Sequence, residues 1–311
     1  MEYGECVSLL MGQDNILVLS HIRPDGDTLG SGAALCSALR RAGKTAYIYE
    51  NPEITDRYLP YVRPWFAPSG FVPDYTVAVD IAEPGLFPLG YAGTVRLCID
   101  HHPSNARYAA DLLLRDKKSA CGEIVLELIK LLHGVPDRAE ATLLYIAIST
   151  DTGCFQYSNT NSDTLRAAAE TLDAGAGIHE LNQRFFRRVS KARIILEGMI
   201  YSGMTFYRDG FVAVATVTND MIAAAGATES DCDDLAGLVG RVEGADVGVT
   251  IREQDNGDSR ISVRSSPAVN SSDICALFGG GGHKMAAGCT LHCPPAEAKR
   301  RLLAAVDKIL G

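Results

Sequence analysis

Short apolar runs alternate with amphipathic segments over the first part of the chain. The apolar runs cover residues 15–21, 44–50, 75–82 and 95–102 and are rich in Val, Ile and Leu. This composition is typical of strands that are buried on both faces of a parallel sheet. Helical patterns cover residues 28–43, 120–134, 137–149 and 162–175. The alternation predicts an α/β domain with an open, mostly parallel sheet and helices on both faces.

The second part of the chain has a different pattern. Residues 178–204 have the periodicity of one continuous helix with a basic cluster. Two β-hairpins are expected over residues 206–217 and 247–265, with turns at Asp209-Gly210 and Asn256-Gly257, and a final amphipathic helix is expected over 296–310. We therefore expect a first domain over residues 1–185, a helical linker over 186–204, and a smaller mixed α/β domain over 205–311. A length of 311 residues agrees with two domains.

Aspartate and histidine residues gather where predicted strands end. In an open α/β sheet the ligand site forms at the carboxyl ends of the strands. The polar residues at these ends, and at the end of the helix that starts near 137, are His21, Asp25, Asp27, Asp80, Asp100, His101, His102 and Asp151. Carboxylates and imidazoles this close together would repel and desolvate one another, so such clusters generally hold metal ions.

The number and kind of these side chains indicate a pair of divalent cations. Mixed carboxylate and imidazole ligands favour Mn²⁺, with Co²⁺ or Mg²⁺ as alternatives. Two cations about 3.5 to 4 Å apart can activate a water molecule and offset charge on phosphoryl oxygens, so hydrolysis of a phosphate ester is the expected chemistry. No protein nucleophile is needed, and Ser31 is interpreted as a small residue that packs within a helix.

The charge of the chain limits the choice of partner. The formal net charge is −9, whereas proteins that bind long nucleic acids usually have a basic face.

No apolar run approaches the ~20 residues that span a bilayer, and the N-terminus lacks the pattern of a signal peptide. The nine cysteines are odd in number and scattered, so we expect them to be unpaired. These features favour a cytoplasmic protein with a small anionic substrate and no membrane partner.

The motifs resemble those of the DHH phosphoesterase superfamily. The matching segments are SHIRPDGDTLGSG, VAVD, IDHHPSN and STDTGCF in the first domain, and SVRSS and FGGGGHKMAAG in the second. The resemblance implies that His21 and Asp25 bind one metal ion, that Asp27, His101 and Asp151 bind the other, and that Asp80 bridges both. It also implies that His102 faces the scissile phosphate and that Asp100 orients His101 by accepting its free ring N–H. Asp80, Asp100 and His102 are thus the expected catalytic residues.

The second domain is expected to bind a further phosphate of the substrate. The resemblance assigns this role to Arg264, Ser265 and His283. The glycines at 280–282 can expose backbone N–H groups to an anion, because glycine permits close approach and positive φ. Gly280, Gly281 and Gly282 are therefore added to the expected phosphate site, although a plain turn is the alternative interpretation.

Members of the superfamily have several different activities, and the sequence motifs distinguish only some of them. The C-terminal segment disfavours family II pyrophosphatases, and the short acidic chain disfavours RecJ-type processing of long DNA. The preferred interpretation is NrnA-type hydrolysis of RNA fragments of about two to five nucleotides, with 3'-dephosphorylation of pAp. A stand-alone phosphodiesterase for cyclic-di-AMP or for linear pApA or pGpG stays open, as does a non-catalytic nucleotide-binding protein. A homodimer is compatible with the sequence.

Overall fold

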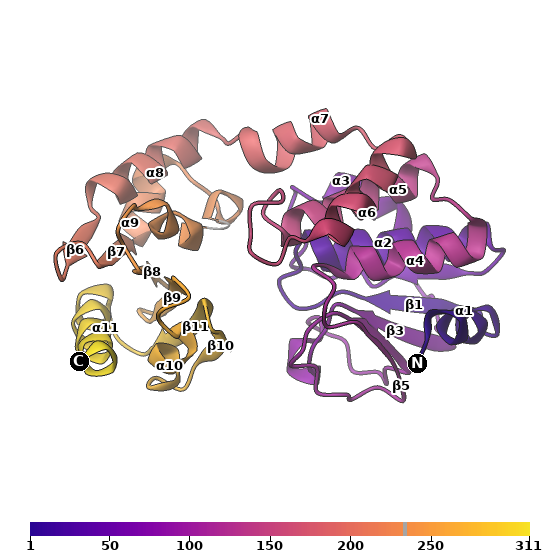
Figure 1. Cartoon of the computed structure of the whole chain (residues 1–311), viewed down its shortest axis with the longest axis horizontal. Coiled ribbons are helices and arrows are strands. Elements are labelled where there is room, and N and C mark those ends of the chain that lie inside the picture. The colour runs from indigo at the N-terminus through magenta and orange to yellow at the C-terminus, as the bar shows by residue number, and fades with distance from the viewer. Residues whose placement is uncertain (233–234) are drawn as a thin grey trace. The chain divides into compact units, whose positions relative to one another are not determined.

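The computed structural model describes residues 1–232 and 235–311, which form two compact units (Figure 1). The first unit is Met1–Arg188 and the second is Val189–Gly311. Each unit has its own hydrophobic core. The boundary lies three residues beyond the end that we expected for the first domain.

The first unit contains a five-stranded sheet in the order β2-β1-β3-β4-β5, in which every neighbouring pair is parallel. Its strands are β1 (Ile16–Leu19), β2 (Ala46–Ile48), β3 (Tyr75–Val79), β4 (Leu97–Asp100) and β5 (Asp111–Leu114). Its helices are α1 (Tyr3–Met11), α2 (Gly26–Arg41), α3 (Leu59–Val62), α4 (Cys121–His133), α5 (Arg138–Asp151), α6 (Ser162–Asp173) and α7 (Ile178–Asn182). The predicted α/β class is confirmed, whereas the sequence patterns gave no prediction of α1 or β5.

The two faces of this sheet are covered differently. Ile16 and Val18 of β1 point into the core that α1, α2, α4 and α5 share, whereas Leu17 and Leu19 point to the opposite face. Residues of the connections around β2, β3 and β4 cover that opposite face, together with the single-turn 3-10 helix η2 (Pro84–Leu86). The long helices that we expected on both faces therefore lie on one, because only a short helical turn forms between β3 and β4.

Small residues let α2 lie deep in the first unit. All residues of α2 from Gly26 to Leu39 are buried. At Gly30, an added Cβ would lie 2.4 Å from the carbonyl oxygen of Leu143 on α5. Close approach of α2 to α5 brings the N-terminal end of one helix near the C-terminal end of the other, where Asp27 and Asp151 lie.

The second unit contains a mixed six-stranded sheet in the order β10-β11-β9-β8-β7-β6. Its strands are β6 (Thr205–Tyr207), β7 (Val212–Val217), β8 (Val247–Glu253), β9 (Ser259–Ser265), β10 (Gly281–His283) and β11 (Ala286–Leu291). Its helices are α8 (Lys191–Ser202), α9 (Asn219–Ala225), α10 (Ser271–Ala276) and α11 (Pro295–Leu310). The hairpins β6-β7 and β8-β9 and the final helix are confirmed, and β7 pairs with β8 in parallel.

The expected continuous helix over 178–204 is wrong. After α7, a π-helical turn (Gln183–Arg187) is followed by Arg188 in an extended conformation. Ser190 then starts α8 as a new N-cap, because its side chain accepts the amide of Arg193. Leu196 and Ile200 of α8 are buried in a cluster of the second unit, so this helix is part of that unit and not a separate linker.

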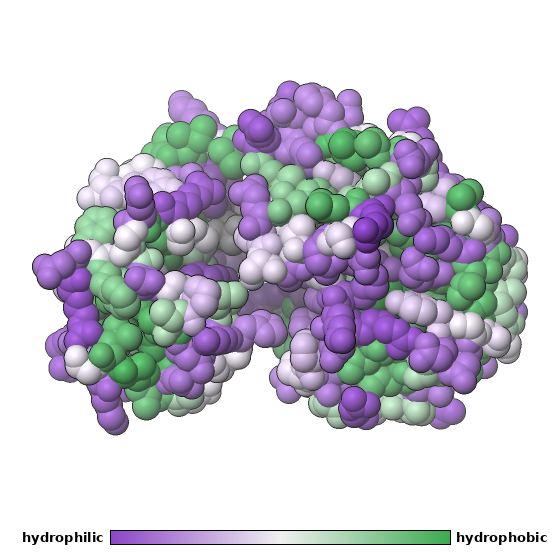
Figure 2. Space-filling view, in the orientation of Figure 1, coloured by the Kyte–Doolittle hydropathy of each residue, from purple (hydrophilic) through white to green (hydrophobic). Residues whose placement is uncertain are grey.

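The surface mixes polar and apolar side chains. Figure 2 shows hydrophilic and hydrophobic areas interspersed on the drawn face of each unit. Within the described residues, no helix has both the length and the apolar character needed to cross a bilayer. All nine cysteines are free thiols, as expected.

The contact at Gly30 predicts the effect of a methyl group between α2 and α5. Gly30→Ala should lower the free energy of unfolding by about 1–3 kcal/mol, because the neighbouring backbone must move. Gly4→Ala in α1 is the control, since no atom lies within 4 Å of the added Cβ. That control should not be destabilised. Denaturant unfolding of both variants gives the measurement, and equal stabilities would contradict close packing at Gly30.

Candidate metal centre

The site lies at the carboxyl ends of the central strands of the first unit. β1, β3 and β4 are adjacent in the sheet, and the residues that follow them meet the start of α2 and the end of α5. All eight Asp and His residues expected in the first unit lie here. Seven of them, all except Asp100, form overlapping groups with Cys121, and within each group the ligand atoms lie within 4.8 Å of one another: His21, Asp25 and Asp80; Asp27, His101 and Asp151; Asp80, His101 and His102; and Asp27, Asp80 and Cys121.

The first group starts at the N-terminus of α2. Asp25 is the N-cap of this helix, and its Oδ1 accepts the backbone amides of Asp27 (2.9 Å) and Thr28 (3.2 Å). The Nε2 atom of His21 lies 3.6 Å from Oδ1 of Asp25 and 3.8 Å from Oδ2 of Asp80. The Nδ1 atom of His21 contacts the carbonyl of Ile22 at 2.8 Å, so the ring can present Nε2 to the site.

Asp80 lies between the two groups. It is 4% exposed, directly follows β3, and has a φ of 62°, which is unusual for a residue other than glycine. Its Oδ1 is buried without a hydrogen-bond partner, 3.3 Å from Nε2 of His101 and 3.4 Å from Nδ1 of His102. A strained backbone and an unsatisfied buried oxygen at one residue are typical of a functional site.

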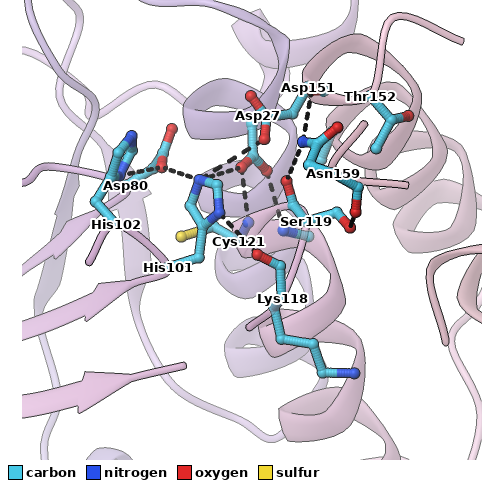
Figure 3. Close-up of polar contacts among 12 residues, drawn as sticks. Asp27, Asp80, His101, His102, Lys118, Ser119, Cys121, Asp151, Thr152 and Asn159 are labelled. Carbon is cyan, nitrogen blue, oxygen red and sulfur yellow. Dashed lines mark hydrogen bonds and ion pairs between the residues drawn. The ribbon is translucent and has the colours of Figure 1, made fainter. Parts of the chain in front are cut away.

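The second group is more deeply buried. Nε2 of His101 lies 3.8 Å from Oδ2 of Asp27 and 3.7 Å from Oδ2 of Asp151. Figure 3 shows His101 between Asp80 and Asp27. Asp27 is fully buried, and both of its oxygens accept hydrogen bonds: Oδ1 from the Ser31 hydroxyl, and Oδ2 from the backbone amide of Cys121.

The prediction that Asp100 orients His101 by accepting its free ring N–H is wrong. Oδ1 of Asp100 contacts Nδ1 of His102 at 2.8 Å and accepts the backbone amides of both histidines, while Oδ2 accepts Asn105. Nδ1 of His101 instead contacts the carbonyl of Lys118 at 3.0 Å. Asp100 thus orients the His102 ring, because the ring of a residue two positions along the chain turns back to it.

Mutual repulsion perturbs the ionisation of these groups. Burial and the nearby charges of Asp80 and Asp151 raise the pKa of Asp27 well above its ordinary value. Burial and repulsion by other carboxylates raise the pKa of Asp151 to about 7, although His101 opposes this. Burial lowers the pKa of His21, but the hydrogen bond and charge of Asp25 and the charge of Asp80 outweigh it and raise that pKa to about 9. The cluster therefore retains protons that a cation would displace.

The structure adds two side chains that the sequence analysis did not place in the site. Ser31 packs within α2, as interpreted, and also donates to Asp27 at 2.8 Å. A spacing of four residues within one helix is a signal that could have shown this. The Cys121 thiol lies close to the carboxylates of Asp27 and Asp80, and no local pattern connects it with residues so distant in the sequence.

The residues expected to bind a second phosphate lie in the second unit. Arg264 of β9 is in register with Ala286 of β11, which is in register with His283 of β10. Directly paired residues share a face, so Arg264 and His283 lie on one face of the sheet, about 10 Å apart across the small Ala286. Ser265 is held by the carbonyl of Val269 and by the hydroxyl of Ser271.

The glycine run is built into the edge of this sheet. Gly281 and Gly282 are exposed on β10, with Gly282 at a φ of 145°. The amide of Gly280 donates to the carbonyl of Cys275 at 3.0 Å, so this amide closes the end of α10 and does not point to an anion. An added Cβ at Gly280 would lie 2.4 Å from Cβ of Cys289, which is a packing reason for glycine.

Comparison with known proteins agrees with this architecture. Residues 15–148 match the DHH family N-terminal domain, and residues 209–311 match the DHHA1 domain. The chain is 38% identical to the bifunctional oligoribonuclease and PAP phosphatase NrnA of Thermus thermophilus, over 89% of this chain and 84% of that protein. It is 27% identical to the Bacillus subtilis protein of the same name, over 93% of each chain.

A solved structure supports the same fold. An exopolyphosphatase-related protein from Bacteroides fragilis superposes with a TM-score of 0.88, at 21% identity, over 98% of this chain and 96% of that one. At this identity the likeness concerns the fold alone. The two family matches, the relative at 38% identity and the buried Asp and His cluster together show that the chain belongs to the DHH family of phosphoesterases.

Proposed function

We propose that this phosphoesterase acts in the cytoplasm, hydrolyses RNA fragments of about two to five nucleotides to mononucleotides, and removes the 3'-phosphate of pAp. The observation that carries the proposal is the buried Asp80 carboxylate, which faces two groups of Asp and His ligands and leaves Oδ1 without a hydrogen-bond partner. The names of the Thermus thermophilus and Bacillus subtilis relatives support the choice of substrate.

The donor set fits a pair of divalent cations. His21, Asp25 and Asp80 would hold one ion, and Asp27, His101, Asp151 and Asp80 would hold the other. The imidazoles of His21 and His101 can each present Nε2 to a cation, because Nδ1 of both rings contacts a backbone carbonyl. Oxygen and imidazole donors favour Mn²⁺, with Mg²⁺ or Co²⁺ as alternatives.

The bound cations would supply Lewis-acid activation of water and compensation of charge on the phosphoryl oxygens. The chain supplies orientation and protons. Burial lowers the pKa of His102, but its hydrogen bond to Asp100 and the charge of Asp80 raise it overall. His102 therefore keeps its proton at higher pH than an ordinary histidine, and that proton can be donated to an oxygen of the substrate phosphate.

Small substrates suit the distribution of charge. A chain of net charge −9 binds a polyanion poorly unless positive groups are concentrated locally. Arg264, with Ser265, His283 and the exposed Gly281 and Gly282, supplies such a group for one further phosphate. We propose that this face of the second unit binds a phosphate that is not the one hydrolysed. A dinucleotide, a trinucleotide or pAp offers such a second phosphate.

A substrate panel tests the proposed activity. With Mn²⁺, the protein should release mononucleotides from RNA dimers and trimers and phosphate from pAp, and rates should fall steeply for a twenty-mer. Asp80→Ala should abolish turnover of every substrate, because it removes a carboxylate common to both ligand groups. Chromatographic product analysis gives the measurement. A preference for cyclic-di-AMP, or equal rates on dimer and twenty-mer, would contradict the proposal.

Replacing Arg264 tests the second phosphate site. Charge-assisted contacts contribute ~1.5 to 3 kcal/mol, so Arg264→Ala should lower kcat/KM on a dinucleotide by about one to two orders of magnitude. Hydrolysis of bis-p-nitrophenyl phosphate, which has no second phosphate, should change little. Arg260→Ala on the same strand is a matched control and should affect neither substrate. An equal loss on both substrates for Arg264→Ala would assign the residue to the fold instead.

The raised pKa values predict how pH affects the metal-free protein. Asp151 and His21 both titrate higher in the folded state than their ordinary values of 3.8 and 6.5, so their contributions to stability are lost as pH rises through about 7 and about 9. The Tm after EDTA treatment should therefore fall as the pH rises from about 6.5 to about 9, the range over which His21 loses its contribution. The rise in Tm on adding Mn²⁺ should grow over the same range, because deprotonated ligands bind metal. A flat or rising Tm of the metal-free protein would contradict this account.

A further inference from the structure

A short segment that leads into α4 and includes its first three residues contacts the group of Asp27, His101 and Asp151 from several directions. This segment, Lys118 to Glu123, is called the 118–123 turn below. Figure 3 shows Ser119 and Cys121 beside His101 and Lys118 below it. None of the motifs that predicted the metal ligands includes these residues, and they are not part of the donor set proposed above.

Asp27 receives its main support from this turn. The amide of Cys121 donates to Oδ2 at 2.7 Å and the amide of Gly122 donates to Oδ1 at 3.0 Å. These are the first amides of α4, which have no partner within the helix and carry its positive dipole end. They hold a fully buried carboxylate in a fixed orientation, although the nearby carboxylates of Asp80 and Asp151 repel it.

The same turn reaches the other two members of the group. The carbonyl of Lys118 contacts Nδ1 of His101 at 3.0 Å, which leaves Nε2 to face Asp27 and Asp151. The side-chain amide of Asn159 donates both to the carbonyl of Ser119 (3.2 Å) and to the carbonyl of Asp151 (3.1 Å). The turn thus connects ligands that come from α2, from the end of β4 and from the end of α5.

Glu123 holds the turn in place. It is 1% exposed, and its Oε1 accepts the amide of Ser119 and the hydroxyl of Thr164, each at 3.0 Å. Its Oε2 pairs with Nζ of Lys118 at 3.2 Å. Both ends of the turn are therefore fixed by one carboxylate near the start of α4, where a negative charge is also favourable to the helix.

Among the described residues, the turn has no polar contact with His21 or Asp25, the two ligands that belong to the first group alone. Their polar contacts are with each other, with Ile22, Asn51 and Asp80, and with residues of the α2 N-terminus, and none of these partners belongs to the turn. Any displacement of the turn should accordingly disturb Asp27, His101 and Asp151 and spare His21 and Asp25, although both groups share Asp80.

We propose that the 118–123 turn is a positioning element for the cation bound by Asp27, His101 and Asp151, and that Glu123 is the positioning residue that fixes it. The inference rests on the proposed function only in assuming that this group binds a divalent cation. It goes further, because it states that the ligands of the two ions, apart from the shared Asp80, are positioned by separate parts of the chain.

Titration of the metal-free protein with Mn²⁺ tests this, with free Mn²⁺ followed by electron paramagnetic resonance. Glu123→Gln keeps the size of the side chain but loses the charge that pairs with Lys118. Residues that support a metal ligand typically change affinity 10–100-fold, so one of two Mn²⁺ sites should weaken about tenfold or more while the other is unchanged. Activity at limiting Mn²⁺ should fall and recover at high Mn²⁺.

Glu140→Gln is the matched control. Glu140 is also fully buried, also lies at the third position of its helix, and also pairs with a cation, Arg41, at 3.0 Å. It has no contact with the ligand groups among the described residues. Both variants should lose thermal stability without metal, but only Glu123→Gln should lose Mn²⁺ affinity. An equal loss in both, or in neither, would overturn the proposal.

A surface variant makes the test independent of the stability of Glu123→Gln. Asn159 is exposed, so Asn159→Ala should fold normally, yet it removes the connection between Ser119 and Asp151. It should weaken the same Mn²⁺ site, and an unchanged titration would refute the positioning role. If the wild-type protein binds two Mn²⁺ ions and no variant changes the affinity of either site, only the positioning role of the turn is refuted. If the unchanged protein binds no Mn²⁺, the proposed function fails with it.

Discussion

Repulsion among the buried carboxylates of Asp27 and Asp80 and the partly buried carboxylate of Asp151 is the constraint on which the site depends. Burial and mutual charge hold protons on Asp27 and Asp151 at pH values where an exposed aspartate is ionised. Backbone amides of α4 and the Ser31 hydroxyl compensate the charge of Asp27 in part, but Oδ1 of Asp80 has no hydrogen-bond partner. A divalent cation would remove this repulsion. The electrostatic repulsion among the carboxylates of the metal-free protein therefore makes the binding of a cation more favourable.

The fold supplies the rigidity that such a cluster needs. Parallel pairing of β1, β3 and β4 brings their carboxyl ends to one edge, and this edge carries His21, Asp80 and the two adjacent histidines. Glycine at position 30 lets α2 approach the backbone of α5, and glycine at position 122 does the same for α4. Three helices can therefore present backbone amides and carboxylates to one point, which longer side chains at these positions would prevent.

Local sequence patterns predict those site residues that follow a recognisable strand, and they do not predict contacts between segments that are distant in the sequence. Strand ends are visible as the last residue of an apolar run, which is why Asp80 and the pair His101-His102 could be placed from patterns alone. The partner of the His101 ring could not, because Lys118 contacts it through a backbone carbonyl that carries no residue signature. Helix α1 was missed because its contribution to the core is mainly Cys6 and Leu10. The break after Arg187 was missed because helical periodicity continues through it.

The glycine run shows how one residue type can serve two purposes within four positions. Gly280 is required by packing, because any side chain there would overlap Cys289 of β11, and its amide closes α10. Gly281 and Gly282 lie on the edge strand, exposed, beside the face that carries Arg264 and His283. An edge strand has backbone groups with no partner strand on one side. Successive amides of an edge strand point alternately towards the partner strand and away from it, so only one of Gly281 and Gly282 can direct its amide outwards. Gly282 is also required by packing, because an added Cβ would lie 2.6 Å from the carbonyl oxygen of Ala286. The anion-binding role expected for the run from sequence is therefore limited to one outward amide of β10, since the amide of Gly280 closes α10.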